Sequence, residues 1–170
     1  LGECGANVLA LEGSQRRARI ARSRTRDQSN VTVASASLSS FKTTCQFDVV
    51  TLIGVLEYAA MDSTADDPAK AMLANIASLV KPDGILILAI ENQLGLKYFA
   101  GAPEDHIGRP MYGLEGRYEK TQPCTYGRQD LVHLLSTAGL NVTSFMAPFP
   151  DYKLPVSIVT EAGFCSDGFD

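Results

Sequence analysis

A glutamate follows a short apolar run near the start of the chain. The run is Val8-Leu9-Ala10-Leu11, and Glu12, Gly13 and Ser14 come directly after it. At the end of a buried strand, one carboxylate can accept hydrogen bonds from two neighbouring hydroxyl groups, such as those of a ribose. The alternative is that Glu12 only favours the positive end of a helix that begins after Ser14. We favour hydroxyl binding by Glu12, with Gly13 beside it.

A second candidate is the pair Asp105 and His106, which lies in a segment rich in glycine and proline. Either side chain could take a proton from a hydroxyl group, and histidine titrates near neutral pH. The alternative, an exposed loop tip over 104–106, is the interpretation that the sequence favours. Glu57 is a further acid that follows an apolar run. It could orient a polar part of a ligand or cap the next element.

The composition is that of a globular protein. The chain has 170 residues, of which 45% are hydrophobic and 20% charged, and its formal net charge is -4. This charge is too small to indicate a nucleic-acid or membrane partner. No apolar run approaches the roughly 20 residues that span a bilayer. The four cysteines form no CxxC pair and there are only two histidines. We therefore expect no metal site, and reduced thiols in the cytoplasm.

Strand-like and helix-like patterns alternate along the chain. The clearest strands are continuous apolar runs, which indicate strands covered on both faces. Apolar residues at helical spacing predict the helices, and Asp67 with Pro68 marks a helix start. We predict strands at 8–11, 31–34, 47–53, 85–90, 142–146 and 155–159, and helices at 15–25, 68–80 and 128–138, with a turn at 81–84. This order predicts an α/β protein with a mostly parallel sheet and a final antiparallel hairpin.

The segment 93–123 interrupts this alternation. It is long, contains many glycines and prolines, and includes three tyrosines. Connections of this length without regular structure are uncommon unless they cover a substrate, so we predict a lid or substrate loop. The alternative is an inert surface insertion. The polar residues 161–170 are expected to fray.

In four stretches the chain resembles the class I S-adenosylmethionine-dependent methyltransferases. Val8 to Glu12 looks like the second strand of that family with its terminal acid, and Phe47 to Tyr58 looks like the fourth strand and the turn after it. Leu79-Val80-Lys81-Pro82-Asp83-Gly84 resembles the entry into the fifth strand, and Tyr126 to Leu140 the helix before the final hairpin. The resemblance implies a Rossmann-like fold over 1–160 and S-adenosylmethionine as cofactor.

The resemblance also implies roles for individual residues. Ser37 and Leu38 would lie at the adenine, where the family commonly has an acid in place of Ser37. Ile53 and Gly54 would face the cofactor through their backbone. The glycine-rich run "E-x-G-x-G-x-G" of the family is absent from the sequence, as is the first strand that precedes it. We therefore expect an incomplete domain with impaired cofactor binding, since the glycines allow close approach to the cofactor.

The expected function is methyl transfer to a small or sugar-linked acceptor. The stretches Glu91 to Tyr98 and Phe149 to Pro155 resemble a bacterial subgroup associated with surface polysaccharides such as O-antigen. One alternative is an inactive remnant or fragment. Another is an NAD-dependent dehydrogenase or epimerase, because an acid after the second strand also binds the ribose of NAD. No Tyr-x-x-x-Lys pair of the epimerase kind supports that alternative.

Overall fold

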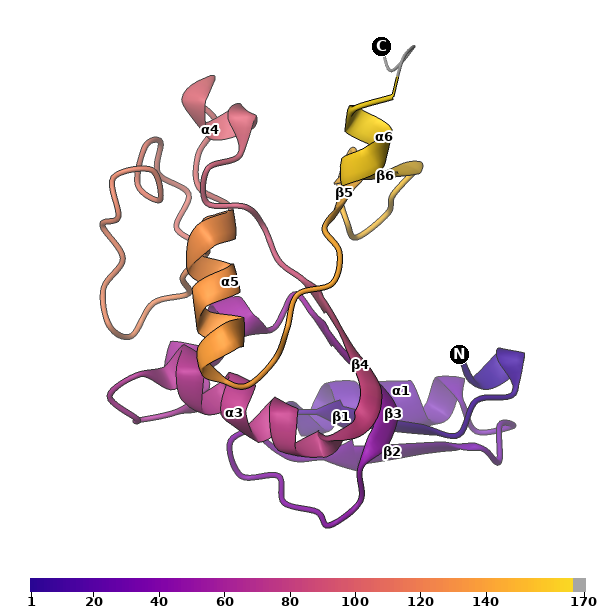
Figure 1. Ribbon diagram of the computed structural model, residues 1–170. Coiled ribbons are helices and arrows are strands. Elements are labelled where there is room, and N and C mark those ends of the chain that lie inside the picture. Colours follow the sequence, from indigo (N-terminus) through magenta and orange to yellow (C-terminus); the bar gives the residue numbers. More distant parts are fainter. Residues whose placement is uncertain (167–170) are drawn as a thin grey trace. The chain divides into compact units, whose positions relative to one another are not determined.

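A computed structural model of the protein describes residues 1–166 (Figure 1). The contacts divide the chain into two compact units, Leu1–Thr44 and a second unit that begins at Cys45. The prediction of one domain over 1–160 stays a prediction, and each unit is described by itself. None of the helices in the described part of the chain is long and apolar enough to cross a membrane.

The first unit is a two-stranded parallel sheet with one helix. A short 3-10 helix, η1 (Gly2–Cys4), ends at Gly5, whose φ is 84°. Strand β1 (Val8–Glu12) pairs with β2 (Val31–Ser35), and helix α1 (Gln15–Arg24) connects them. Ser14 caps α1 by accepting a hydrogen bond from the Arg17 amide. Both strands and the helix were predicted within one or two residues.

The second unit contains a second parallel pair, β3 (Phe47–Ile53) with β4 (Val80–Ala89). Helix α3 (Pro68–Leu79) connects these strands and contacts both, as Figure 1 shows. Asp67 caps α3 with a hydrogen bond from Lys70, and Pro68 takes the first helical position, as predicted. The core is built from the inward side chains of β3 and α3: Leu52, Met72, Leu73, Ile76 and Leu79.

Only one face of the β3–β4 sheet is buried within this unit. Along β3 the exposed residues Val49 and Ile53 alternate with Val50 and Leu52. Ile85 and Ile87 of β4 lie opposite Val49 and Thr51 and are 54% and 50% exposed. Within the second unit only one face is therefore covered, and the prediction that both faces are covered stays a prediction. A continuous apolar run does not reveal how many faces of a strand have a neighbour.

The predicted turn at 81–84 is part of β4. Phe47 pairs with Val80, and Val49 already pairs with Ile85, so residues 81–84 form an irregularity in the ladder. A Cβ atom on Gly84 would lie 2.9 Å from the Phe47 carbonyl oxygen, which explains why glycine occupies that position. The prediction of a turn before the strand is therefore wrong: residues 81–84 belong to β4, as an irregularity in its ladder.

The rest of the second unit consists of short elements. η2 (Leu56–Tyr58) and α2 (Ala59–Asp62) follow β3, and α4 (Leu96–Phe99) lies inside the segment predicted as a loop. Helix α5 (Arg128–Thr137) is followed by the antiparallel pair β5 (Met146–Phe149) and β6 (Ser157–Thr160). The first hairpin strand thus lies later than predicted. Helix α6 (Glu161–Phe164) occupies the start of the predicted frayed tail, and residues 167–170 lie outside the described part.

Candidate functional site

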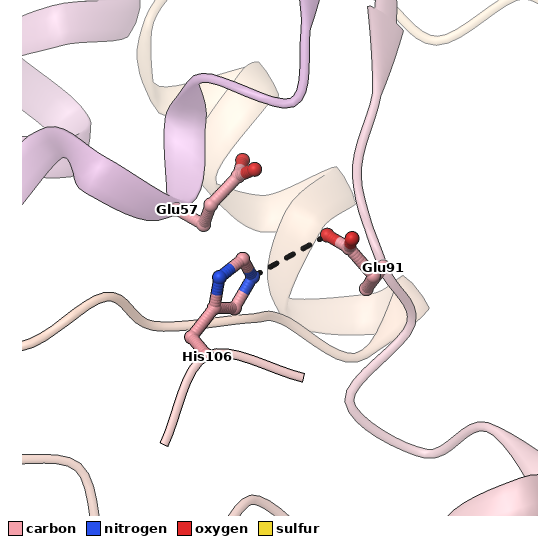
Figure 2. Close-up of side chains that lie close together, drawn as sticks. All are labelled: Glu57, Glu91 and His106. Carbon is pink, nitrogen blue, oxygen red and sulfur yellow. Dashed lines mark ion pairs between the residues drawn. The ribbon is translucent and has the colours of Figure 1, made fainter. Parts of the chain in front are cut away.

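Three titratable side chains meet beyond the carboxyl ends of β3 and β4. Glu57 lies in η2, Glu91 follows β4, and His106 comes from the segment 93–123 (Figure 2). One ligand-type atom from each residue lies within 4.8 Å of the other two. Nε2 of His106 lies 3.5 Å from Oε2 of Glu91, with side-chain exposures of only 9% and 6%. Ligands of α/β sheets bind at this end of the strands.

The imidazole of His106 is held from two directions. Its Nδ1 lies 3.2 Å from the hydroxyl of Tyr58, and the two rings meet edge to face. The carboxylate of Glu104 accepts hydrogen bonds from the amides of His106 and Ile107, at 2.8 and 2.6 Å. Glu104 is 3% exposed, so this turn is anchored inside the protein. The predicted exposed tip at 104–106 is therefore wrong for Glu104 and His106.

Glu91 is tied to the segment between β5 and β6. Its Oε1 accepts hydrogen bonds from Lys153 at 2.9 Å and from the Tyr152 hydroxyl at 3.2 Å. Burial acts to raise the pKa of Glu91, but the hydrogen bond from Lys153 and the charges of Lys153 and His106 outweigh it. The pKa of Glu91 consequently lies below its ordinary value. Glu91 is thus a carboxylate at neutral pH.

Glu57 has the opposite electrostatic environment. It is 2% exposed. Burial raises its pKa, and the negative charge of Glu91 adds to that effect, against the weaker influence of His106 and Lys153. Its Oε2 has no hydrogen-bond partner among the described residues, and the same holds for Oε2 of Glu91 and Nε2 of His106. Three buried polar atoms of the cluster therefore lack hydrogen-bond partners in the described part of the chain, and two of them, Nε2 of His106 and Oε2 of Glu91, form a 3.5 Å ion pair.

Asp105, the other predicted base, has a different environment. Its Oδ2 accepts hydrogen bonds from Lys97 at 2.6 Å and from the Tyr98 hydroxyl at 2.8 Å. Burial acts to raise the pKa of Asp105, but these two hydrogen bonds and the Lys97 charge lower it on balance. A carboxylate that already accepts two hydrogen bonds and has a lowered pKa is a poor proton acceptor. Its geometry suits an anchor for the segment around α4.

Glu12 lies at the end of β1, in the first unit, where it was predicted. Its Oε1 accepts hydrogen bonds from the Ser14 amide at 2.8 Å and from Nε and Nη2 of Arg17 at 3.0 and 2.8 Å. The hydrogen bonds from Arg17 and Ser14 hold the pKa of Glu12 below its ordinary value. The side chain of Glu12 is thus an ionised carboxylate that accepts hydrogen bonds. All the hydrogen bonds described for it end on Oε1, and none on Oε2. The Ser14 contact also agrees with the alternative role at the start of α1.

The other cofactor residues of the first unit are Gly13, Ser37 and Leu38. A Cβ atom on Gly13 would meet no heavy atom within 4 Å, so its backbone is open to approach. The hydroxyl of Ser37 lies 2.7 Å from that of Ser39 and also accepts a hydrogen bond from the Ser39 amide. Leu38 is half-buried beside it. The structure leaves the predicted adenine contacts of Ser37 and Leu38 as predictions.

Ile53 and Gly54 lie at the end of β3, close to the buried cluster. Ile53 is 45% exposed. Gly54 has a φ of +63°, and a Cβ atom there would lie 2.8 Å from the Tyr152 hydroxyl and 3.5 Å from Oε1 of Glu57. Glycine is required at this position because the backbone is left-handed and its neighbours are close. Tyr152 therefore occupies the space beside Gly54.

The sequence reasoning placed Glu57, Glu91 and His106 separately and missed their convergence. One signal was available, because acids that follow neighbouring parallel strands meet at the same sheet edge. Tyr58 and Lys153 carried no signal of their own. Their roles depend on the path of segments that have no periodic pattern.

The donor and acceptor groups fit S-adenosylmethionine in one respect that the structure shows. A ribose presents two hydroxyl donors, and Glu12 is an ionised strand-end carboxylate with Oε2 outside its described hydrogen bonds. Gly13 next to it leaves open space. The ribose contacts of Glu12 and Gly13 stay a prediction with which these two observations agree.

Comparison with known proteins identifies the family. The family model described as "Methyltransferase domain" matches residues 1–86, just over half of the chain. A search among curated proteins gave no match.

Three solved structures illustrate the likeness in fold. A 1,6-didemethyltoxoflavin-N1-methyltransferase from Burkholderia thailandensis is 18% identical with a TM-score of 0.55, and covers 87% of this chain and 67% of its own. The YcgJ protein from Bacillus subtilis is 16% identical, with a TM-score of 0.53 and coverages of 83% and 56%. The [4+2]-cyclase SpnF is 17% identical, with a TM-score of 0.55 and coverages of 79% and 42%.

At these identities the likeness shows the fold alone: a mixed α/β protein with parallel strand pairs and a final antiparallel hairpin. The chain spans 56% of YcgJ and 42% of SpnF. The family match extends over both β1–β2 and β3, and it includes Glu12 and Glu57. The chain therefore belongs to the class I S-adenosylmethionine-dependent methyltransferases.

Proposed function

We propose that this chain takes part in methyl transfer to a small acceptor with a hydroxyl group, including sugar-linked acceptors. The observation that carries the proposal is the buried Glu57–Glu91–His106 cluster at the carboxyl ends of β3 and β4. S-adenosylmethionine, when bound, supplies a methyl group on a positively charged sulfur. The protein must align the acceptor oxygen with that methyl group and exclude water.

His106 is the proposed proton acceptor. Nδ1 interacts with the Tyr58 hydroxyl, so Nε2 is the ring nitrogen left to take a proton from the acceptor. Protonation there creates a positive charge 3.5 Å from Oε2 of Glu91, whose ionised form stabilises it. Burial strengthens this interaction because the surroundings screen charge less than water does.

The segment 93–123 is the proposed substrate loop. His106 belongs to it, and its side chain is only 9% exposed. An acceptor therefore reaches Nε2 only if this segment moves, and the return of the segment then excludes water from the reacting groups. This behaviour is that of a lid, and lid motions of this kind set the rate of many enzymes.

A sugar-linked acceptor is favoured by the position of two stretches. The stretches 91–98 and 149–155 are those that resemble the surface-polysaccharide subgroup. Lys153 and Tyr152 from the second stretch bind Glu91 from the first, at the buried cluster. A subgroup-specific feature at the proposed acceptor site supports a subgroup-specific acceptor. We propose the cytoplasm as compartment because none of the four cysteines, all of which the structure describes, is in a disulfide. We propose no nucleic-acid partner because the net charge is only -4.

A second candidate is a non-catalytic protein with the methyltransferase fold. Two contacts favour it: Arg17 occupies Oε1 of Glu12, and Tyr152 fills the space beside Gly54. Both lie where the cofactor was predicted to bind. A fold also does not determine a reaction, as the structural likeness to a protein named a cyclase illustrates.

The variant His106→Ala tests the proposed role of the cluster. Methyl transfer to a panel of hydroxyl-bearing small molecules and sugars is measured at saturating S-adenosylmethionine, in metal-chelating buffer. We expect kcat to fall by about 100-fold or more, because a positioned base contributes that much. Cofactor affinity should change little. The matched control is His133→Ala, since His133 is the other histidine and is exposed on α5. Unchanged turnover in His106→Ala would remove this residue from the site.

A further inference from the structure

The atoms of the buried cluster that lack hydrogen bonds point to a ligand that the methyl transfer does not supply. Oε2 of Glu57, Oε2 of Glu91 and Nε2 of His106 are buried and have no hydrogen-bond partner among residues 1–166. All three side chains are at least nine-tenths buried. Buried polar atoms are normally paired, so three that converge need a common partner. A cation is a partner that two carboxylate oxygens and an imidazole nitrogen can share.

The remaining contacts of these residues present the three atoms inward. Oε1 of Glu91 is held by Lys153 and Tyr152, which leaves Oε2 toward His106. Nδ1 of His106 interacts with Tyr58, which leaves Nε2 toward the carboxylates. A histidine that binds a metal usually donates its other ring N–H to a neighbour, and Tyr58 is placed to accept it. Figure 2 shows the three side chains converging from separate segments.

The spacing suits a single ion. One ligand-type atom of each of the three residues lies within 4.8 Å of the other two. Ligands at about 2.0–2.2 Å from one ion are about 3–4 Å apart, so small side-chain rotations close the site. The cation charge would be balanced by Glu57 and Glu91, with Lys153 already paired to Glu91.

We propose that Glu57, Glu91 and His106 bind one first-row divalent cation of the Mn²⁺ or Zn²⁺ class. The ligand set decides the class. An imidazole suits transition metals, and carboxylates suit harder ions such as Mn²⁺. Calcium requires six to eight oxygen ligands, more than this cluster offers. The cation and a proton would both bind Nε2 of His106. The protein therefore cannot hold the cation and use His106 as a proton acceptor at the same time.

The ligands are far apart in the sequence, which explains why spacing gave no sign of a site. No two of them share a short motif, and only two histidines are present in the chain. This proposal therefore replaces the expectation of no metal site, which rested on spacing alone.

The test titrates Mn²⁺ into the full chain after it has been stripped with EDTA. Mn²⁺ is the probe because Cys4, Cys45 and Cys165 are exposed, and thiolates select softer ions. Electron paramagnetic resonance measures bound Mn²⁺, and NMR follows the two histidine side chains. We expect one ion per chain and selective broadening of the His106 signals, with His133 as the internal reference. This measurement needs no variant and neither cofactor nor acceptor, so it is independent of methyl transfer.

Variants then assign the ligands. Glu91→Gln and His106→Ala should weaken Mn²⁺ binding by about 100-fold or more, while His133→Ala and Glu119→Gln should leave it unchanged. Circular dichroism confirms that each variant is folded. The proposal is overturned if Mn²⁺ broadens neither histidine or both equally. It is equally overturned if a folded His106→Ala protein binds the ion as tightly as the wild type.

Discussion

Glu57 and Glu91 are neighbours in one cluster, yet their pKa values shift in opposite directions. Burial dominates for Glu57 and raises its pKa. For Glu91 burial also acts to raise the pKa, but the hydrogen bond from Lys153, together with the charges of Lys153 and His106, lowers it on balance. Glu91 accepts a hydrogen bond from the Lys153 ammonium and Glu57 has no such cation among the described residues, so the fold favours the uncharged form of Glu57 and the charged form of Glu91. The two residues should therefore respond differently to pH.

The variant Glu57→Gln should gain stability relative to the wild type as pH rises. The raised pKa of Glu57 in the folded state means that its stabilising contribution is complete below the unfolded value, about 4.3. That contribution is lost as pH rises through the folded pKa. Glutamine does not ionise and has no such loss. Urea unfolding from about pH 4 to pH 8, in EDTA, should show the free-energy difference moving in favour of the variant.

For Glu91→Gln we expect the opposite pH dependence of the stability difference from the wild type. The pKa of Glu91 is lowered in the folded state, so its contribution is present above the unfolded pKa and is lost as pH falls through the folded one. This variant should be less stable than the wild type at neutral pH, and the difference should shrink toward acidic pH. Parallel pH profiles for the two variants would contradict the opposing environments described for these carboxyl groups.

At the scale of elements, the segment 93–123 is ordered by its own polar side chains. Its length and its glycines predicted a loop, and this was correct apart from the short helix α4. Glu104 accepts hydrogen bonds from two amides in its own turn and from the Tyr118 hydroxyl. Gln93 donates to the Gly113 carbonyl, 20 residues away. Such contacts cannot be read from periodicity, because each joins residues in an irregular backbone.

The variant Glu104→Ala should both destabilise the protein and release His106. It leaves two amides without their buried acceptor, a loss of about 3 kcal/mol in the free energy of unfolding. The turn over 104–107 then loses its anchor, so the contact between His106 and Tyr58 should weaken. Thermal unfolding and the NMR signals of His106 measure the two effects.

Glu115→Ala is the control for this element. Glu115 is in the same segment, and its exposed carboxylate pairs with Arg117. An exposed pair contributes little to stability, so this variant should resemble the wild type. Equal destabilisation by both substitutions would show that the segment is not anchored through Glu104.

Element positions were predictable where a pattern repeats. The spacing of Met72, Leu73, Ile76 and Leu79 gave α3, and Asp67 with Pro68 gave its start. The beginning of β4 and the position of β5 were missed, because a ladder irregularity and a short strand depend on pairing partners. Dependence on distant partners also explains why the site was not predicted. Glu57 and His106 stood out in the sequence and Glu91 did not, and the meeting of the three depends on long-range contacts.

At the scale of the whole chain, the residues predicted for the cofactor belong to both compact units. Glu12, Gly13, Ser37 and Leu38 belong to the first unit, whereas Ile53 and Gly54 belong to the second, as does the Glu57–Glu91–His106 cluster. A variant in the first unit therefore tests cofactor binding without altering the cluster. The residue to substitute in that test is Glu12.

Isothermal titration of the 170-residue chain with S-adenosylmethionine separates the active from the non-catalytic candidate. We expect binding that is weaker than micromolar, because no glycine-rich run in this sequence lets a backbone approach the cofactor closely. Glu12→Gln should weaken it by a further factor of about 10, since a neutral amide replaces a charged acceptor. Glu3→Gln is the control, because Glu3 lies in η1 of the same unit and is exposed. Micromolar affinity would contradict impaired binding. No detectable heat at millimolar concentrations would instead favour a fold that has lost its cofactor, and Glu12 would then serve only to hold Arg17 and the start of α1.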